Sequence, residues 1–350
     1  MSITTQLIER YRHMRGMSLL RGLCEGQYAF VGIGSHSTSC LYPVLAHLHV
    51  PLKYICCRTP GKLPLVERAY PGVRATTSLR QVLEDDEVRG VLVSASPQAH
   101  FTLASQVLRA GKSLFIEKPP CASLAELQML QALEAKSHVP VVAVDLQKRM
   151  APAVQVLRRE LSGQRDIAYD LRYLTGAYPE GNPLLDLFIH PIDLVCHLFG
   201  RAEVRAVERS RGTLLVLLRH RHAMGSLRLS TDYSWSHARE SLEVNTPRGT
   251  YTLGQMERLT FRRAQRTWMG IPLEKVLPGT VGEEELFARN PFVPTLPNNQ
   301  LYVQGYYSSV RRFVEQVEGR GGRNEQSLHS LTDTYRLLEE VGERAGAGSC

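Results

Sequence analysis

Between residues 28 and 144 the chain alternates short apolar runs rich in β-branched residues with longer segments of helical periodicity. This alternation limits the possible folds more than any other feature. Strands separated by helices of about 10 to 15 residues form βαβ units with right-handed crossovers, and these units build a parallel sheet with helices on both faces. The first part of the chain is therefore predicted to be α/β. The predicted strands are 29–33, 52–57, 90–94, 113–116 and 139–144.

Beyond Pro152 the strand-like runs follow one another without helices between them. This pattern predicts a second, α+β domain with an open, mostly antiparallel sheet in the form of a meander. One helical stretch at 184–199 enters before the sheet is established, and helices at 306–317 and 328–341 finish the chain. The predicted strands of this domain are 168–174, 203–208, 213–218, 226–230, 242–245 and 250–253.

These patterns divide the chain into three parts. Residues 1–27 are predicted to form a helical extension, residues 28–150 a domain of dinucleotide-binding type, and residues 151–350 a domain for substrate binding and oligomerisation. Residues 255–300 contain five prolines and little periodicity, and we expect an extended loop there. An open sheet face in the last domain favours a homodimer or homotetramer.

The formal net charge is +8, and the basic residues are dispersed in pairs without a long basic block. This distribution argues against nucleic-acid binding and suits a phosphorylated cofactor or substrate. No run of about eighteen apolar residues occurs, so no membrane span is predicted. The seven cysteines have no C-x-x-C spacing and are expected to be reduced thiols of a cytoplasmic protein.

A glycine motif, Gly32-Ile-Gly34-Ser35-His36-Ser37, follows the first predicted strand and precedes a helical pattern. In this context the two glycines permit a tight turn, and the backbone N–H groups at the start of the helix can bind a pyrophosphate. We therefore predict cofactor binding by Gly32, Gly34, Ser35 and His36. Ser37 occupies the third glycine position, which leaves an ordinary strand-to-helix turn as the alternative.

The end of the second predicted strand bears on the choice of cofactor. NAD sites usually present a carboxylate there to the ribose 2′-hydroxyl. This chain has Arg58 instead, with Lys62 four residues later. A cation at this place attracts a 2′-phosphate, so NADP(H) is the preferred cofactor and NAD(H) is possible. If Arg58 is only a solvated charge, the preference is open.

Two further polar groups follow predicted strands. Ser96 and Pro97 come after the strand at 90–94 and are expected near the nicotinamide, whereas His100 is either a site residue or a residue of the helix start. Glu117 and Lys118 end the apolar strand at 113–116 and place an ammonium group at the carboxyl edge of the sheet, where open α/β folds bind ligands. The alternative for Lys118 is a salt-bridged surface lysine.

Asp186, His190 and Asp193 stand at i, i+4 and i+7 in an otherwise apolar stretch. On one helix they would share a face, but Pro191 also permits a helix start there, with Asp186 supplied by a preceding turn. A histidine beside a carboxylate can exchange a proton with a substrate hydroxyl, so we predict a catalytic role. The alternative is a satisfied core histidine. No metal site is predicted, because no further His or Cys falls at ligand spacing.

Taken together, these motifs resemble the Gfo/Idh/MocA oxidoreductase family over residues 28–200. Glu117-Lys118-Pro119 is similar to the most specific motif of the family, and Pro97 with His100 is similar to its P-x-x-H loop. The remaining matches are Arg149 with Pro152, as R-x-x-P, and Asp186, His190 and Asp193, as D-x-x-x-H-x-x-D. The departures are Ser37, in place of the third glycine, and Phe188, where the family commonly has glycine.

The resemblance implies a Rossmann domain, an open-sheet second domain and an NAD(P)-dependent oxidoreductase acting on a sugar, sugar nucleotide or cyclitol. It implies that Lys118 contacts cofactor and substrate and that His190 is the acid/base, and we expect Asp186 to orient it. Two alternatives stay open: an imine reductase of a biosynthetic pathway, and a non-catalytic dinucleotide-binding sensor. Candidate substrate contacts are Arg149, Tyr173, Tyr178, Asn182 and Asp193. For Tyr173, Tyr178 and Asn182 the alternative is simple packing.

Overall fold

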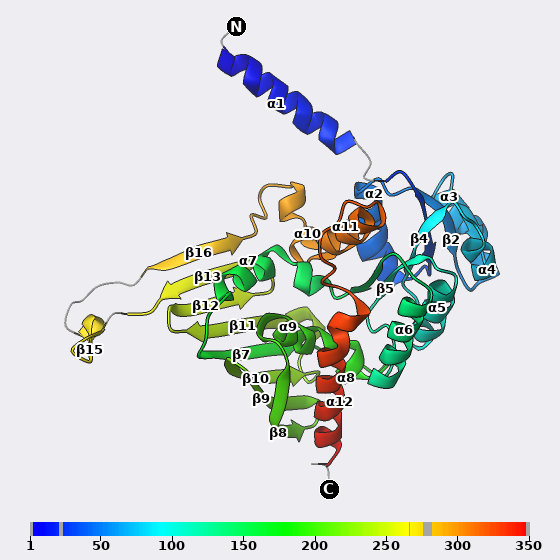
Figure 1. Cartoon of the computed structure of the whole chain (residues 1–350). Coiled ribbons are helices and arrows are strands. Elements are labelled where there is room, and N and C mark those ends of the chain that lie inside the picture. The colour runs from blue at the N-terminus through cyan, green and yellow to red at the C-terminus, as the bar shows by residue number, and fades with distance from the viewer. Residues whose placement is uncertain (1–2, 21–23, 266, 276–281, 348–350) are drawn as a thin grey trace. The chain divides into compact units, whose positions relative to one another are not determined.

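The computed structural model of the protein describes residues 3–20, 24–265, 267–275 and 282–347. Its first sheet has six strands in the order β3-β2-β1-β4-β5-β6 (Figure 1). β1 pairs in parallel with both β2 and β4, so the strand order reverses direction at β1. The strands are β1 (Gln27–Val31), β2 (Leu52–Cys56), β3 (Arg74–Thr76), β4 (Val88–Val93), β5 (Ser113–Glu117) and β6 (Val142–Asp145).

The central strands of this sheet are apolar and buried along nearly their whole length, as expected when helices cover both faces. Ser78 caps α4, because its hydroxyl accepts the Gln81 N–H. The helices between the strands are α2 (Tyr42–His47), α3 (Leu63–Ala69), α4 (Leu79–Leu83), α5 (Pro97–Arg109) and α6 (Leu124–Lys136). A helix α1 (Ile3–Leu20) precedes β1.

The second sheet has eight strands in the order β16-β13-β12-β11-β7-β10-β9-β8. β7 and β10 run parallel, while the other pairs are antiparallel. The predicted meander is therefore corrected: the first strand in sequence lies inside the sheet, between two antiparallel groups. The strands are β7 (Ile167–Leu174), β8 (Ala202–Ser210), β9 (Thr213–His220), β10 (Ala223–Ser230), β11 (Arg239–Thr246), β12 (Gly249–Gly254), β13 (Arg258–Arg263) and β16 (Glu283–Ala288).

The prediction of an extended loop at 255–300 is wrong for much of its length. β13 and β16 pair with each other and extend the second sheet, and a small hairpin of β14 (Thr267–Trp268) and β15 (Ile271–Pro272) lies between them. The prolines made this stretch look like a loop, but all five fall outside β13 and β16 and none interrupts their pairing. Residue 266 and residues 276–281 of this stretch lie outside the described residues.

One face of the second sheet is buried and the other is exposed, since side chains alternate in burial along β9 and β10. α7 packs on β13 and β16, and α12 packs on β8 and on α9. The helices that follow β6 in the chain are α7 (Pro152–Leu161), α8 (Pro183–Asp186), α9 (Ile189–Phe199), α10 (Gln300–Val303), α11 (Tyr306–Val317) and α12 (Thr332–Ala347). Of these, α11 lies mostly in the segment Val310–Asn324, which belongs with the first sheet, and its Phe313 packs on Phe115 of β5. Among the described residues, no helix has both the length and the apolar character needed to cross a membrane.

The chain forms two compact units, each built from separated segments. The first comprises Met1–Ile116, Leu133–Ala143 and Val310–Asn324, and the second Glu117–Ala132, Val144–Ser309 and Glu325–Cys350. The second unit therefore begins at Glu117, which is the last residue of β5 and the first residue of the Glu117-Lys118-Pro119 motif. The simple domain boundary near residue 150 stays a prediction.

Candidate functional site

The glycine turn after β1 has the backbone geometry that a dinucleotide turn requires. Gly32 has φ +110°, and a Cβ built on it would lie 1.9 Å from the carbonyl oxygen of Ser94, just after β4. Only glycine fits a left-handed conformation this close to a neighbouring strand. A Cβ on Gly34 would meet nothing within 4 Å, so the turn opens onto free space at the edge where the strand order reverses.

Ser37 explains how the turn forms without a third glycine. Its side chain is fully buried, and its hydroxyl accepts the Gly34 N–H at 2.9 Å and donates to the Gly34 carbonyl at 3.0 Å. The hydroxyl thus closes the turn from inside. Gly34, Ser35 and His36 stay exposed at the start of the helical segment that follows. These residues fit the pyrophosphate of a dinucleotide, because a helix N-terminus presents N–H groups and a positive dipole end.

Two cations follow β2, at the place where the sequence predicts the ribose contact. Arg58 is exposed two residues beyond the strand. Lys62 reaches the glycine turn itself, because its Nζ donates to the Ile33 carbonyl at 3.4 Å. The structure therefore brings positive charge next to the turn, although it leaves the Arg58 side chain in solvent.

The loop after β4 contains Ser96 and Pro97, which begin α5, and Ser96 is exposed at the N-cap. His100 differs from the cofactor contact proposed for it. Its ring is 1% exposed, and its Nε2 accepts the Ala95 N–H at 3.2 Å. We correct its role accordingly: His100 holds the loop in shape from below, because a ring this deeply buried presents no surface to a ligand.

Lys118 lies in the second compact unit together with Asp186 and His190. Its Nζ donates to the backbone carbonyl of Asp186 at 2.7 Å, and its own N–H donates to Glu117 Oε2 at 3.2 Å. Burial lowers the pKa of Lys118, while the negative charges of Glu117 and Asp186 oppose that shift. Lys118 is thus an anchored, desolvated ammonium group, and the surface salt bridge considered as its alternative does not describe it.

Asp186, His190 and Asp193 do not share one helix. α8 ends at Asp186 and α9 begins at Ile189, so Asp186 comes from a preceding turn and His190 lies in the first turn of α9. Asp186 and His190 are both buried, at 6% and 7% exposed. The break places Phe188 in the core, where its ring meets Tyr173 edge-on at 6.3 Å between centroids. This packing accounts for a phenylalanine where relatives commonly carry glycine.

Asn182 and Tyr178 lie around the Asp186 carboxylate. The Asn182 N–H donates to Asp186 Oδ2 at 2.9 Å, and the Asn182 side-chain oxygen caps α8 by accepting the Leu184 N–H at 3.0 Å. Asn182 is therefore a positioning residue for Asp186, since its side-chain acceptor is engaged. Tyr178 and the Asp186 carboxylate both lie against Gly181. Burial and then the charge of Asp186 raise the pKa of Tyr178.

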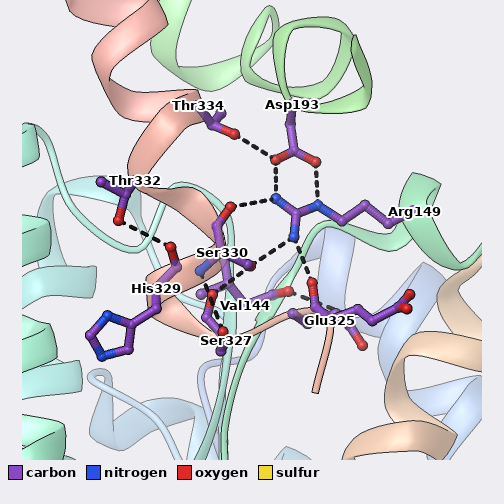
Figure 2. Close-up of polar contacts among 10 residues, drawn as sticks. Val144, Arg149, Asp193, Glu325, Ser327, His329, Ser330, Thr332 and Thr334 are labelled. Atoms are coloured by element: carbon purple, nitrogen blue, oxygen red, sulfur yellow. Dashed lines mark hydrogen bonds and ion pairs between the residues drawn. The ribbon is translucent and has the colours of Figure 1, made fainter. Parts of the chain in front are cut away.

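Arg149 and Asp193 are not free to bind a substrate, contrary to their prediction. Figure 2 shows the Arg149 guanidinium facing the Asp193 carboxylate, with Nε donating to Oδ2 at 2.7 Å and Nη2 donating to Oδ1. Each residue is 2% exposed. Thr334 of α12 donates to Asp193 at 2.9 Å, and Arg149 Nη1 donates to the Glu325 carbonyl at 2.6 Å and to the Ser330 hydroxyl at 2.7 Å. The pair is a structural tie within the unit.

A second charged pair, Lys148 and Glu240, was missed by the sequence reasoning. Lys148 Nζ donates to Glu240 Oε2 at 2.5 Å and lies 4.5 Å from the centre of the Tyr173 ring. Burial alone would lower the pKa of Lys148, but the Glu240 charge and the Tyr173 ring outweigh it and raise the pKa. Both residues line a cavity of about 270 Å³. Only the position of Lys148 beside Arg149 hinted at it, because Glu240 is 92 residues away.

A parallel sheet that reverses its order at a glycine turn, with cations beside that turn, defines a dinucleotide-binding α/β protein. Residues 27–145 match the Gfo/Idh/MocA family model, described as "Oxidoreductase family, NAD-binding Rossmann fold". Over this domain the chain is therefore similar to the Gfo/Idh/MocA family.

Curated relatives resemble this chain over part of its length. The uncharacterized oxidoreductase YhhX of Escherichia coli is 26% identical over 190 residues, which cover 50% of this chain and 54% of that protein. An inositol 2-dehydrogenase of Leifsonia xyli is 26% identical over 210 residues, covering 53% and 60%. The chain thus spans little more than half the length of these relatives.

Solved structures match the fold over nearly the whole chain. A dehydrogenase from Chromobacterium violaceum aligns with a TM-score of 0.76 at 21% identity, covering 92% of this chain and 95% of that one. An Agrobacterium radiobacter oxidoreductase, solved with NAD⁺, L-tartaric acid and magnesium, aligns with a TM-score of 0.76 at 17% identity, covering 93% and 97%. These likenesses confirm the predicted fold class, a Rossmann sheet followed by an open, mostly antiparallel sheet.

Proposed function

We propose that the protein is an NAD(P)-dependent oxidoreductase acting on a CH–OH or C=O group of a sugar, sugar nucleotide or cyclitol. One observation carries the proposal: Lys118, anchored 2.7 Å from the Asp186 carbonyl, shares a compact unit with the buried Asp186 and His190. Burying an ionisable group costs free energy unless it is paired, and ionisable groups with a shifted pKa cluster at functional sites. The oxidoreductase family that the N-terminal domain matches indicates the reaction in which Lys118, Asp186 and His190 would act.

The cofactor is expected to bind at the glycine turn, with its pyrophosphate on the exposed backbone of Gly34, Ser35 and His36. When bound, its nicotinamide supplies the hydride acceptor or donor. We further propose a preference for NADP(H), supported by Arg58 and by Lys62 on the turn, and by the absence of a carboxylate at 56–60.

The residues of the second unit divide the remaining work. His190 takes the proton from the substrate hydroxyl during oxidation and returns it during reduction. Asp186, held by the Asn182 N–H, orients His190. Lys118 donates a hydrogen bond to the reacting oxygen, and its desolvation strengthens that bond. Lys118 is thus the electrostatic group and His190 the acid/base.

The test begins with fluorescence titrations of the protein with NADPH and NADH, followed by a substrate panel under the preferred cofactor. Lys118→Ala and His190→Ala are each expected to lower kcat about 100-fold or more, because each removes a group that acts in the transition state. For His190→Ala, the dissociation constant of the cofactor should change far less than kcat does. Turnover at the wild-type rate in both variants would disprove the assignment.

We also propose that the protein assembles as a homodimer or homotetramer through the exposed face of the second sheet. Leu215 and Leu217 of β9 and Met224 of β10 are 51%, 41% and 46% exposed there, and an apolar patch of this kind marks an interaction surface. Light scattering after size exclusion measures the mass of the assembly directly.

A cytoplasmic location is proposed because the six described cysteines carry free thiols.

A further inference from the structure

We infer that α1 binds the surface of an anionic lipid bilayer, with the apolar stripe formed by Leu7, Ile8, Tyr11 and Met14 inserted between the lipid head groups. This inference goes beyond the proposed function and does not depend on it. It concerns the part of α1 whose side chains the structure describes, residues 4–14.

The apolar stripe is exposed to solvent. Leu7, Ile8, Tyr11 and Met14 are 62%, 47%, 61% and 56% exposed, and every other described side chain of α1 is exposed as well. An isolated helix of 18 residues is only marginally stable in water, and a helix normally gains its stability by burying an apolar face. In the part of the chain that the structure describes, no surface covers this face of α1.

The order of residues along α1 makes the segment amphipathic. Successive residues of an α-helix point about 100° apart, so the four residues of the apolar stripe fall within about 120° of the circumference. The opposite side is polar and holds Thr5, Gln6, Glu9 and His13. The apolar stripe ends at Gly16, beyond which Met17 and Leu20 lie off its line. Residues 4–14 thus form about three turns with one apolar side.

Two arginines border the apolar stripe, Arg10 along one margin and Arg12 along the other. Arginine at such a margin can rest its aliphatic stem on apolar surface and hold its guanidinium at the level of the head groups. Glu9 is the one acid in residues 4–14 of the sequence, and it lies on the far side. A basic amphipathic helix of this pattern is typical of a membrane-surface segment, because negative lipid head groups complement the arginines.

The same arginines disfavour a second copy of α1 as the occupant of the apolar stripe. If two such stripes packed on each other, Arg10 and Arg12 of one helix would border the arginines of the other, with no acid at the margins to pair with them. Three turns are also short for a coiled coil, which needs about three to four heptads. An anionic bilayer supplies both an apolar layer for the stripe and negative charge for its margins.

The length and composition of α1 suit a helix that lies on a bilayer and does not cross it. Among the described residues, no helix is long and apolar enough to span a membrane. An amphipathic helix lies in the plane of the interface with its apolar face buried by about 5–10 Å. Tyr11 fits this depth, because amphipathic aromatic side chains concentrate at the boundary between lipid and water.

Flotation of the whole protein with lipid vesicles tests the inference. Vesicles of phosphatidylcholine with about 30% phosphatidylglycerol should carry the protein, whereas vesicles of phosphatidylcholine alone should carry at least about tenfold less. About 0.5 M NaCl should release most of the bound protein, because salt screens the attraction between the arginines and the lipid. Failure of the wild type to float with the anionic vesicles would overturn the inference.

Leu7→Glu and Gln6→Glu form a matched pair of variants. Each adds one negative charge to the same turn of α1, but only Leu7 belongs to the apolar stripe. Leu7→Glu should lower the partition coefficient on anionic vesicles at least about tenfold, because it removes a large apolar group from the inserted side. Gln6→Glu, on the polar side, should lower it no more than about threefold. Equal losses would mean that net charge alone attracts the protein, and the inserted stripe would be refuted.

A double variant, Arg10→Gln with Arg12→Gln, tests the charged margins. One arginine near an anionic surface raises the partition coefficient roughly fivefold, so the pair contributes roughly 25-fold. The double variant should lose that factor on anionic vesicles and behave like the wild type on neutral ones. An unchanged preference for phosphatidylglycerol would assign the lipid contact to other basic residues of the chain and overturn the role of α1.

Two further measurements complete the test. The melting temperature and the NADPH affinity should be the same in all these variants, since each replaces an exposed residue of α1. If the mass from light scattering without lipid falls in Leu7→Glu, the apolar stripe contacts a second copy of the chain and the inference is wrong. Flotation requires neither cofactor nor substrate, so a failure of the proposed function would leave its result unchanged.

Discussion

At the scale of single residues, the site depends on side chains whose roles follow from their surroundings more than from their type. Ser37 replaces a glycine yet preserves the turn, because its buried hydroxyl bonds both polar groups of Gly34. His100 matches a family motif, but its buried ring bonds the Ala95 N–H. Lys118 is the opposite case: its burial and its bond to the Asp186 carbonyl make the functional prediction stronger.

The two glycines of the turn allow a paired prediction. Gly32→Ala should destabilise the protein by at least about 1–3 kcal/mol, because the residue has φ +110° and the new Cβ would lie 1.9 Å from the Ser94 carbonyl. Gly34→Ala has open space and should keep the wild-type melting temperature. Since its Cβ would occupy the approach of the pyrophosphate, NADPH affinity should fall about tenfold or more. Thermal melts and fluorescence titration measure both; unchanged NADPH affinity in Gly34→Ala would place the cofactor elsewhere.

At the scale of elements, the break between α8 and α9 separates Asp186 from the helix that carries His190 and Asp193. A continuous helix would have put Asp186 and Asp193 on the same face as the imidazole. The break at Leu187 and Phe188 supplies Asp186 from a separate turn and leaves Asp193 to Arg149. The amphipathic pattern could not reveal this, because two short helices in sequence keep the apolar spacing of one longer helix.

The Arg149–Asp193 tie should be a matter of stability. Arg149→Met is expected to lower the free energy of unfolding by about 3–5 kcal/mol, because it leaves Asp193 buried without its partner. Adding Asp193→Leu to Arg149→Met should recover part of that loss, since both charges are then gone. Urea unfolding measures both variants. If Arg149→Met unfolds like the wild type but has a much higher KM, Arg149 contacts the substrate after all.

At the scale of the whole molecule, packing makes stability depend on pH through His197 of α9. Burial, followed by the charges of Arg149 and Arg158, lowers the pKa of His197 from 6.5 to about 4, with Asp193 and Glu325 acting against them. Above pH 6.5 both the folded and the unfolded states hold a neutral imidazole. As the pH falls toward 4, only the unfolded state takes up the proton, so the free energy of unfolding decreases.

Replacement of His197 by Gln should remove that part of the acid sensitivity. The lowering of the His197 pKa from 6.5 to about 4 corresponds to a loss of at most about 3 kcal/mol in the free energy of unfolding between these pH values. Urea unfolding of the wild type and of His197→Gln at several pH values between 4 and 7 provides the comparison. As the pH falls from 6.5 toward 4, the free energy of unfolding should decrease more for the wild type than for His197→Gln, because only the unfolded wild type takes up a proton at residue 197. Equal decreases in the two proteins would show that the pKa of His197 is not lowered in the folded state.

The amino-acid sequence alone predicted most of the strands and helices and the position of the glycine turn, but not β3, β13 or β16. The correct predictions depend on local properties: apolar periodicity, the conformational freedom of glycine and the chemistry of helix starts. The sequence also placed Lys118, Asp186 and His190 as candidates, since charged residues inside apolar runs stand out without a structure. What it could not provide were pairings between distant residues. β7 inside the second sheet, β13 and β16 within a proline-rich stretch, and Glu240 beside Lys148 are all contacts between segments far apart in the chain.

Those distant contacts decided which polar residues are available for chemistry. Arg149 and Asp193 both belong to family motifs, yet they are buried and form an ion pair with each other. Glu240 belongs to no motif, yet it lines a cavity, and folding leaves its Oε1 buried with no hydrogen-bond donor among the described residues. The physical reason is the cost of burying a polar group: whether a partner meets it is settled by tertiary packing, which local sequence does not encode.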